Sequence, residues 1–247
     1  MASTSETGHA KNVSNFDDLI SFVTGYGTAY NPSKASIKLT ALQSLSTSAK
    51  TAISAVNASL PAYSNAVSAR EVAFEPLSKL VTRVMNALKA TDTTEQVDDS
   101  AKTLVRKIQG IRAKAKLTEE EKAALAAEGK EVKEISSSQM SYDSRLDNFD
   151  KLVKLLGSIT LYAPNEVELK VATLTSLIAD LNVKNTAVVT ATTPLSNARI
   201  SRNDILYKAN TGLVEIAIDV KSYIKSLYGA TSPQYKQVSK LEFKGVK

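Results

Sequence analysis

The sequence predicts an all-α protein, an elongated antiparallel helical bundle of long, kinked helices with an internal duplication. Glycine and proline, the residues that most often end helices, are scarce, at nine and six among 247 residues. Apolar residues recur at alternating three- and four-residue spacings over long stretches, which is typical of one narrow helical face. A segment of roughly 75 residues is followed by a similar one later in the chain, and a match of this length indicates a duplication.

The duplication is recognised from two similar stretches. Residues 15–32 read NFDDLISFVTGYGTAYNP, and residues 148–164 read NFDKLVKLLGSITLYAP. The similarity continues beyond them at a constant offset, because Tyr30 and Tyr162 are 132 residues apart and the same offset relates many later pairs. These pairs include Pro32 with Pro164, Leu42 with Leu174, Asn65 with Asn197, Arg70 with Arg202 and Val84 with Ile216. The sequence therefore predicts one repeat at 15–91 and a second at 148–231.

Along the chain, each repeat opens with a short helix, at 15–24 and at 148–157, followed by a turn and a long helix. The long helices are expected near 33–91 and 165–228, and both contain a proline, Pro61 and Pro194. Proline costs about 3 kcal/mol inside a helix and commonly ends it. The three-and-four spacing nevertheless passes both prolines without a change of phase, which favours kinked continuous helices over two hairpins.

The connecting segment at 95–147 is also expected to be helical. The stretch KLTEEEKAALAAEG, with Thr118 and Glu121 spaced as a capping box, marks a possible new helix start within it. If that start is only a kink, the chain forms three long helices running up, down and up. A flexible tail is expected at residues 1–13, a single helical-bundle domain at 14–231 and a C-terminal tail at 232–247.

The residue types exclude many kinds of catalysis. Cysteine is absent, and the single histidine, His9, lies in the expected N-terminal tail. Histidine-based acid–base catalysis and histidine metal sites need an imidazole held in place. Glycine-rich phosphate loops and EF-hand loops are also missing from the sequence. We therefore expect a non-enzymatic protein with no cofactor, no metal site and no small-molecule substrate.

A basic stretch, AKTLVRKIQGIRAKAK at 101–116, is the most distinctive charged segment. One side carries apolar residues, and the rest of the helix would present basic residues, namely Lys102, Arg106, Lys107, Arg112, Lys114 and Lys116. Such a helix can bind an anionic membrane or nucleic acid. It is also compatible with a bundle helix that has a basic outer face, neutralised by the acidic residues that follow.

Arg70 and Arg202 occupy equivalent places in the two repeats, at positions where the apolar spacing predicts a hydrophobic residue. A polar residue at such a position usually fixes the register of helix packing at a cost in stability. The alternative is that each arginine extends along a seam and reaches solvent with its charged end. We predict the register-fixing role.

These observations favour a non-catalytic structural or interaction protein that self-associates or binds a protein partner. The alternative is a basic amphipathic-helix protein that binds an anionic surface, either a membrane, an inclusion or nucleic acid. A net charge of +6 supports an anionic partner only weakly, because 25 acidic residues are mixed with 31 basic ones. The sequence shows neither a signal peptide nor an apolar segment of membrane-spanning length, so the expected location is the cytoplasm.

Overall fold

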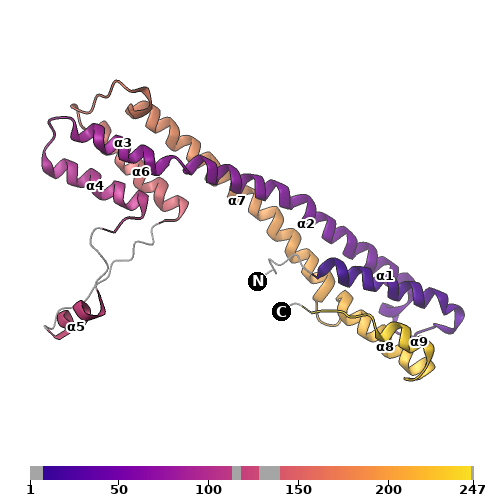
Figure 1. Cartoon of the computed structure of the whole chain (residues 1–247). Helices are drawn as coiled ribbons and strands as arrows, with labels where there is room; N and C mark the ends of the chain where they lie inside the picture. Colours follow the sequence, from indigo (N-terminus) through magenta and orange to yellow (C-terminus); the bar gives the residue numbers. More distant parts are fainter. Residues whose placement is uncertain (1–7, 113–117, 128–139, 246–247) are drawn as a thin grey trace. The chain divides into compact units, whose positions relative to one another are not determined.

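The computed structural model describes residues 8–112, 118–127 and 140–245, and these residues form helices and turns without a β-strand (Figure 1). The fold class is therefore all-α, as predicted. The helices are α1 (His9–Gly25), α2 (Leu39–Phe74), α3 (Leu77–Lys89), α4 (Glu95–Gln109), α5 (Glu119–Ala127), α6 (Tyr142–Gly157), α7 (Val171–Tyr207), α8 (Leu213–Tyr228) and α9 (Pro233–Ser239). Short 3-10 turns lie at η1 (Gly27–Ala29), η2 (Ala35–Ile37) and η3 (Val167–Leu169). In the described part of the chain, none of the helices combines the length and apolar character needed to cross a membrane.

The chain divides into two compact units. Unit 1 contains residues 1–64 and 190–247, and unit 2 contains residues 65–189. Each unit therefore contains parts of both predicted repeats. One repeat contributes its short helix and the start of its long helix. The other contributes the end of its long helix and the helix that follows. In unit 1 these parts include α1 and α8, and in unit 2 they include α6 and α3.

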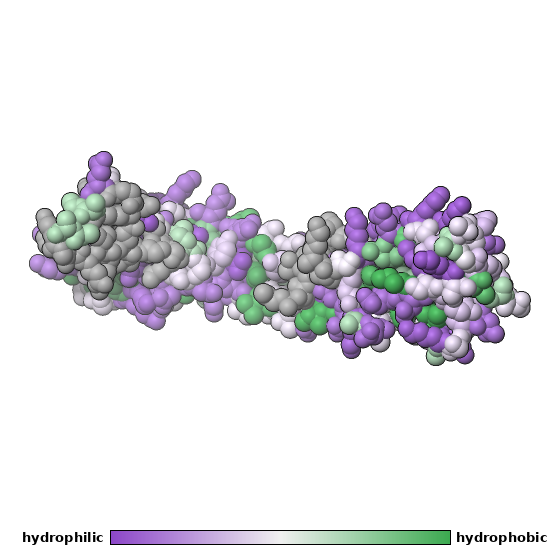
Figure 2. All heavy atoms as spheres, turned by 90° about the horizontal axis from the view of Figure 1, so that it is seen from below, coloured by the Kyte–Doolittle hydropathy of each residue, from purple (hydrophilic) through white to green (hydrophobic). Residues whose placement is uncertain are grey.

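Unit 1 has its core between α1 and α8. The apolar residues of α1 at spacings of three and four, Phe16, Leu19 and Val23, are at most 1% exposed. They share one core cluster with residues of α8, among them Leu213, Ile216, Val220 and Ile224. The face in Figure 2 shows hydrophobic residues, in green, among hydrophilic ones, in purple, over the part of unit 1 that holds α8 and α9. Exposed apolar residues scattered in this way are ordinary for a protein surface.

Unit 2 is a helical bundle in which α4 packs against both α3 and α6. Its core contains Phe149, Leu152 and Leu156 from α6, all fully buried, and it includes residues of the other two helices, among them Val81, Val84, Leu88, Val105 and Ile108. Burying a side chain of this kind stabilises the fold by about 1.5–3 kcal/mol. The apolar face of each of the three helices is therefore covered by other helices of the same unit.

A matched hydrogen bond occurs in the two units. The hydroxyl of Tyr30 donates to the carbonyl oxygen of Ile37 at 2.6 Å, and the hydroxyl of Tyr162 donates to that of Leu169 at 2.9 Å. Each bond spans seven residues and joins the turn before a long helix to the end of a 3-10 turn. The predicted duplication requires such equivalent contacts, although common descent of the two segments stays a prediction.

The long helices continue through both prolines, because Pro61 lies inside the 36-residue α2 and Pro194 inside the 37-residue α7. Along α7, residues seven apart are buried throughout, namely Leu174, Leu181, Val188, Leu195 and Arg202. The unbroken spacing in the sequence therefore identified a continuous helix correctly. Both helices end earlier than expected, however, at Phe74 and Tyr207. Pro76 directly precedes α3, which agrees with the tolerance of proline at helix starts.

The connecting segment contains the new helix start that the sequence suggests, because α4 ends at Gln109, Gly110 adopts a left-handed conformation with φ 70°, and α5 begins at Glu119. Two other boundaries predicted from the sequence need correction. The expected N-terminal tail at 1–13 includes the start of α1, which begins at His9. The expected C-terminal tail at 232–247 includes α9, whose Val238 is fully buried.

Candidate functional site

The start of α1 buries polar side chains where a bundle helix usually buries apolar ones. His9, Asn12 and Asn15 are spaced three residues apart and are 5%, 2% and 5% exposed. This spacing places them on one side of the helix, next to the apolar face that begins at Phe16. Buried polar groups require hydrogen-bond partners, because water is no longer available to them. The partners come from the end of α7 and from the residues after α9.

Tyr207, the last residue of α7, meets the first turn of α1. Its hydroxyl oxygen lies 2.6 Å from Nδ1 of His9, and it accepts a hydrogen bond from Nδ2 of Asn12 at 3.3 Å. Burial raises the pKa of Tyr207, while the hydrogen bond from Asn12 and the charge of Arg202 act in the opposite direction. The imidazole of His9 is therefore held in place, and the expectation that it lies in a flexible tail is wrong.

The residues after α9 are bound to α1 through their main chain. Asn12 makes a paired contact with Lys244, because Nδ2 of Asn12 donates to the carbonyl oxygen of Lys244 at 2.8 Å and Oδ1 accepts from its amide at 3.0 Å. Nδ2 of Asn15 donates to the carbonyl oxygen of Glu242 at 2.7 Å. The ammonium group of Lys221 on α8 donates to the carbonyl oxygen of Leu241. We call residues 241–244 the C-terminal segment.

The side chains of the C-terminal segment alternate in burial. Leu241 and Phe243 are half-buried against the core of unit 1, whereas Glu242 and Lys244 are exposed. This alternation is typical of an extended chain, in which successive side chains point to opposite sides. The ammonium group of Lys221 also lies 5.2 Å from the centre of the Phe243 ring, within range of a cation–π interaction. The site therefore contacts both the main chain and one aromatic side chain.

Arg202 lies close to this cluster and is 1% exposed. Its Nε and Nη2 both donate to Oδ1 of Asn203, at 3.1 and 3.0 Å. An arginine buried to this extent does not extend to solvent, so the alternative role considered from the sequence does not apply to Arg202. Its burial is compatible with the predicted register-fixing role, which stays a prediction.

Unit 2 has a different set of residues at the equivalent place. Tyr142 begins α6, and its ring lies 4.9 Å from that of Phe74 at the end of α2. The guanidinium carbon of Arg70 lies 4.0 Å from the centre of the Tyr142 ring, and that of Arg145 lies 5.5 Å from the centre of the Phe74 ring. Two cations thus pack on two aromatic rings, an arrangement that is stabilising when partly shielded from water.

The arginines of unit 2 are incompletely hydrogen-bonded. The buried Nε atoms of Arg70 and Arg145 have no hydrogen-bond partner among the described residues. Arg145 donates from Nη2 to the carbonyl oxygen of Phe74 at 3.3 Å, and burial lowers its pKa, an effect that the nearby Tyr142 opposes. Asn148, at the place equivalent to Asn15, donates to the carbonyl oxygen of Ser144 on its own helix at 2.7 Å. Among the described residues of unit 2, Asn148 therefore makes no contact with the main chain of a distant segment like that of Asn15 in unit 1.

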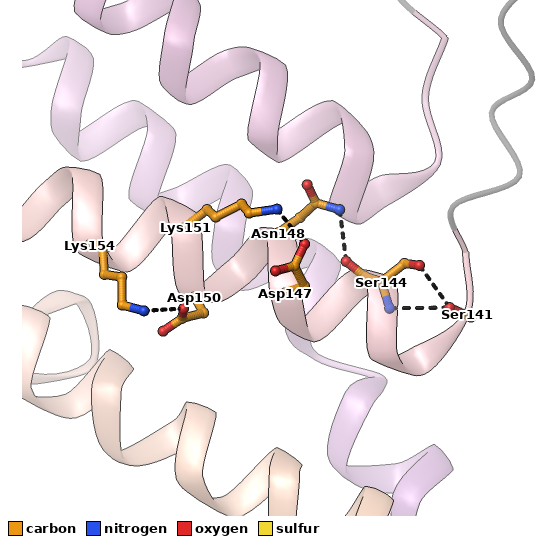
Figure 3. Close-up of polar contacts among 7 residues, drawn as sticks. All are labelled: Ser141, Ser144, Asp147, Asn148, Asp150, Lys151 and Lys154. Carbon is orange, nitrogen blue, oxygen red and sulfur yellow. Dashed lines mark hydrogen bonds and ion pairs between the residues drawn. The ribbon is translucent and has the colours of Figure 1, made fainter.

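An open groove of about 460 Å³ lies between α6 and α7 in unit 2, and Asp143, Asp147 and Asp150 line it. Figure 3 shows that Asp147 and Asp150 form ion pairs on their own helix, with Lys151 at 2.5 Å and with Lys154 at 2.6 Å respectively. Pairs of this kind between residues four apart are common on exposed helix surfaces. In the residues that the structure describes, no group of three His, Cys, Asp or Glu side chains is placed to hold a metal ion.

The basic stretch predicted from the sequence is divided between helix and turn. Arg106 and Lys107 lie in the last turn of α4, where their charges favour the negative end of the helix dipole. Lys102 lies 3.8 Å from Asp99, and Arg112 is exposed beyond the helix end. The apolar side of the helix, including Val105 and Ile108, is buried in the core of unit 2. The remaining two predicted residues, Lys114 and Lys116, lie outside the described residues.

Arg70 and Arg202 were predicted as site residues from their place in the apolar spacing, whereas the polar face of α1 was not predicted. A signal for it was present, because HAKNVSNF places His9, Asn12 and Asn15 at helical spacing before Phe16. Comparisons of the chain with protein-family models, with curated proteins and with solved structures found no match.

Proposed function

We propose that the protein is a non-catalytic structural or interaction protein, a cytoplasmic helical scaffold that associates with a second copy of itself through α2. The supporting observation is the exposed surface of residues 39–64 of this helix in unit 1. Lys50 is the one charged residue in this range, and the other exposed positions hold Ser, Thr, Ala, Asn, Gln and Pro. Charged residues are depleted in the cores of protein interfaces, whereas exposed helix faces usually carry many.

Several hydroxyl groups on this face are already hydrogen-bonded within the helix. Thr47 donates to the carbonyl oxygen of Gln43, Ser48 to that of Ser44 and Thr51 to that of Thr47, each at 3.0 Å. Covering a hydroxyl group that keeps its partner avoids most of the cost of burying a polar group. A partner helix can therefore pack on this face with a small loss of hydration energy.

The same face contains an open groove of about 490 Å³, lined by Lys50, Thr51, Ser54, Ala55 and Ala58. The short side chains permit a close approach of a second helix, because the distance between packed helices depends on the side chains at the contact. A second copy supplies a helix with the same small, uncharged face. Symmetric contacts of this kind are the most common in homo-oligomers.

The test is the mass of the assembly in solution. We expect the wild-type chain to form a dimer or a larger assembly with increasing concentration, and the double variant Ser54→Glu/Ala58→Glu to require at least tenfold more protein for the same association. Thr103→Glu on the exposed side of α4 is the control. A wild-type chain that stays monomeric at high concentration, or an unchanged association in the double variant, would contradict the proposal.

The alternative, binding to an anionic surface through the basic stretch, has weaker support. An amphipathic helix inserts its apolar side into a membrane interface. In α4 that side is occupied, because Ala101, Val105 and Ile108 are at most 7% exposed in the core of unit 2. Only the basic side remains for an electrostatic contact. Salt-sensitive retention on anionic vesicles or nucleic acid, lost in Arg106→Gln/Lys107→Gln/Arg112→Gln, would revive this alternative.

A further inference from the structure

The buried face of α1 has the properties of a peptide-binding site that the chain's own C-terminal segment fills. Asn12 and Asn15 use their side-chain amides to bind main-chain groups of Lys244 and Glu242. A main-chain contact of this kind gives affinity without depending on the bound sequence, while pockets for alternate side chains give selectivity. Here the alternate side chains that are half-buried are Leu241 and Phe243.

The two amides lie on a regular helix, and one of them has a partner outside the segment. Both lie in the first turns of a 17-residue helix, and Asn12 also donates to the hydroxyl of Tyr207, a residue of α7. A site on a rigid helix loses little conformational entropy when its ligand binds. This feature distinguishes the site from an ordinary contact between a helix and a terminal segment.

The segment is held by hydrogen bonds to its main chain and by two half-buried side chains, without being part of a helix. It has no regular secondary structure, Glu242 and Lys244 are exposed, and the preceding helix α9 ends at Ser239. The segment can therefore leave α1 without unwinding a helix, and partly exposed segments open at a smaller free-energy cost than core helices. An opened segment removes the main-chain partners of Asn12 and Asn15, although Asn12 keeps its hydrogen bond to Tyr207. The loss of these buried hydrogen bonds favours rebinding of a matching chain.

We propose that α1 binds the C-terminal segment of a second copy of the chain when its own segment is displaced. The occupant is residues 241–244 of that copy, because this is the sequence that the structure shows bound. The contact joins two copies through exchange of identical segments, a low-cost route to association. It is independent of the α2 face proposed above, since it uses α1, α8 and the residues after α9.

The first experiment measures binding of a fluorescent peptide with the sequence of residues 240–245 and blocked ends. The full-length variant Leu241→Gly/Phe243→Gly keeps the α1 site but weakens its own segment. We expect saturable binding to this variant, and binding at least tenfold weaker to the wild-type chain, whose site is occupied. Adding Asn12→Ala should weaken binding at least tenfold, whereas adding Asn148→Ala, the counterpart of Asn15 in unit 2, should not change it.

A second measurement separates a binding defect from a folding defect, because it changes the peptide and leaves the protein variant the same. A peptide with glycine in place of Phe243 should lose binding to the same folded variant. Absence of wild-type peptide binding to Leu241→Gly/Phe243→Gly at native helicity would overturn the site. Equal binding with and without Asn12→Ala would overturn the role of the amide.

The last experiment tests the second copy as the source of the segment. Chain one carries Leu241→Gly/Phe243→Gly, and chain two carries Asn12→Ala/Asn15→Ala, so that one has only the site and the other only the segment. Both also carry Ser54→Glu/Ala58→Glu, which removes association through the α2 face. We expect a complex of the two chains in the mixture and none of either alone. Peptide binding without this complex would overturn exchange between copies and leave the α2 proposal unaffected.

Discussion

Units 1 and 2 place different chemistry at equivalent positions of their short helices. In unit 1 the start of α1 presents His9, Asn12 and Asn15, and these side chains bind Tyr207 and a segment of main chain. In unit 2 the start of α6 presents Tyr142 and Arg145, which pack on an arginine and an aromatic ring. The apolar positions that follow are equivalent, since Phe16 and Phe149 are both fully buried. Similar apolar cores in the two units are therefore compatible with different polar contacts at the helix starts.

The largest expected effect tests whether the two cores are equivalent in stability. Phe16→Ala and Phe149→Ala each remove a fully buried ring, and we expect each to reduce the free energy of unfolding by about 3–5 kcal/mol. Hydrogen exchange should show that each change weakens mainly its own unit. Equal loss of protection in both units after either substitution would mean that they unfold as one.

The next effect distinguishes the two arginines. Arg202→Leu should destabilise by about 1–3 kcal/mol, because Arg202 is buried and removing it takes both donors from Oδ1 of Asn203. Arg70→Leu should cost less than Arg202→Leu, because the loss of its cation–π contact with Tyr142 is offset by removal of a buried Nε that has no hydrogen-bond partner among the described residues. Urea unfolding followed by circular dichroism measures both. A larger loss for Arg70→Leu would show that its contact with Tyr142 contributes more than the contacts of the buried Arg202.

A smaller effect should be shared by both units. Tyr30→Phe and Tyr162→Phe each remove a buried hydrogen bond to a carbonyl oxygen, and we expect a loss of about 1 kcal/mol in each case. Leu and Ala variants at these positions would remove packing as well, so phenylalanine is the matched change. A difference of several kilocalories per mole between the two variants would argue against equivalent turns.

The same tyrosines predict a decline of stability at high pH. Burial, with a contribution from Glu166, raises the pKa of Tyr162 to about 12, and burial also raises the pKa of Tyr30. Between about pH 10 and 12 the unfolded chain has lost these protons while the folded chain keeps them, so the free energy of unfolding falls as pH rises. It should be insensitive to these groups below pH 10. The Phe variants should show a shallower decline when unfolding is measured on both sides of pH 10.

The smallest effect compares two aspartates at equivalent places. Asp17 accepts a hydrogen bond from Ser46 at 2.6 Å and pairs with Lys50 at 2.9 Å, both on α2, whereas Asp150 pairs with Lys154 on its own helix. We expect Asp17→Ala to cost about 1 kcal/mol and Asp150→Ala at most about 0.5 kcal/mol. Thermal unfolding at low and high salt measures both. A larger loss for Asp150→Ala would show that contacts within α6 matter more than contacts between helices.

The spacing of apolar residues along the chain predicted most of the helices. The buried polar face of α1 was not predicted, because it depends on contacts between residues far apart in the sequence. The seven-residue repeat identified the buried positions of α7, and it carried the helix through Pro194 because packing along the whole face outweighs one lost hydrogen bond. The polar face of α1 was missed because its partners are remote, since Asn12 contacts Tyr207 and Lys244 at separations of 195 and 232 residues. A single sequence shows that His9 and Asn12 are polar but not that they are buried.

The division of unit 1 between the two ends of the chain has a consequence for synthesis on the ribosome. Unit 2 is complete once residue 189 has emerged, whereas residues 8–64 must wait for residues 190–245. Domains usually fold in the order in which they are made, but here the second unit along the chain is the first that can close. Until Leu206 and Leu213 arrive, Phe16 and Leu19 have only the early residues of their core cluster, such as Leu42, to cover them. The nascent chain therefore exposes part of the apolar face of α1 for most of its translation, and we expect chaperones to bind there.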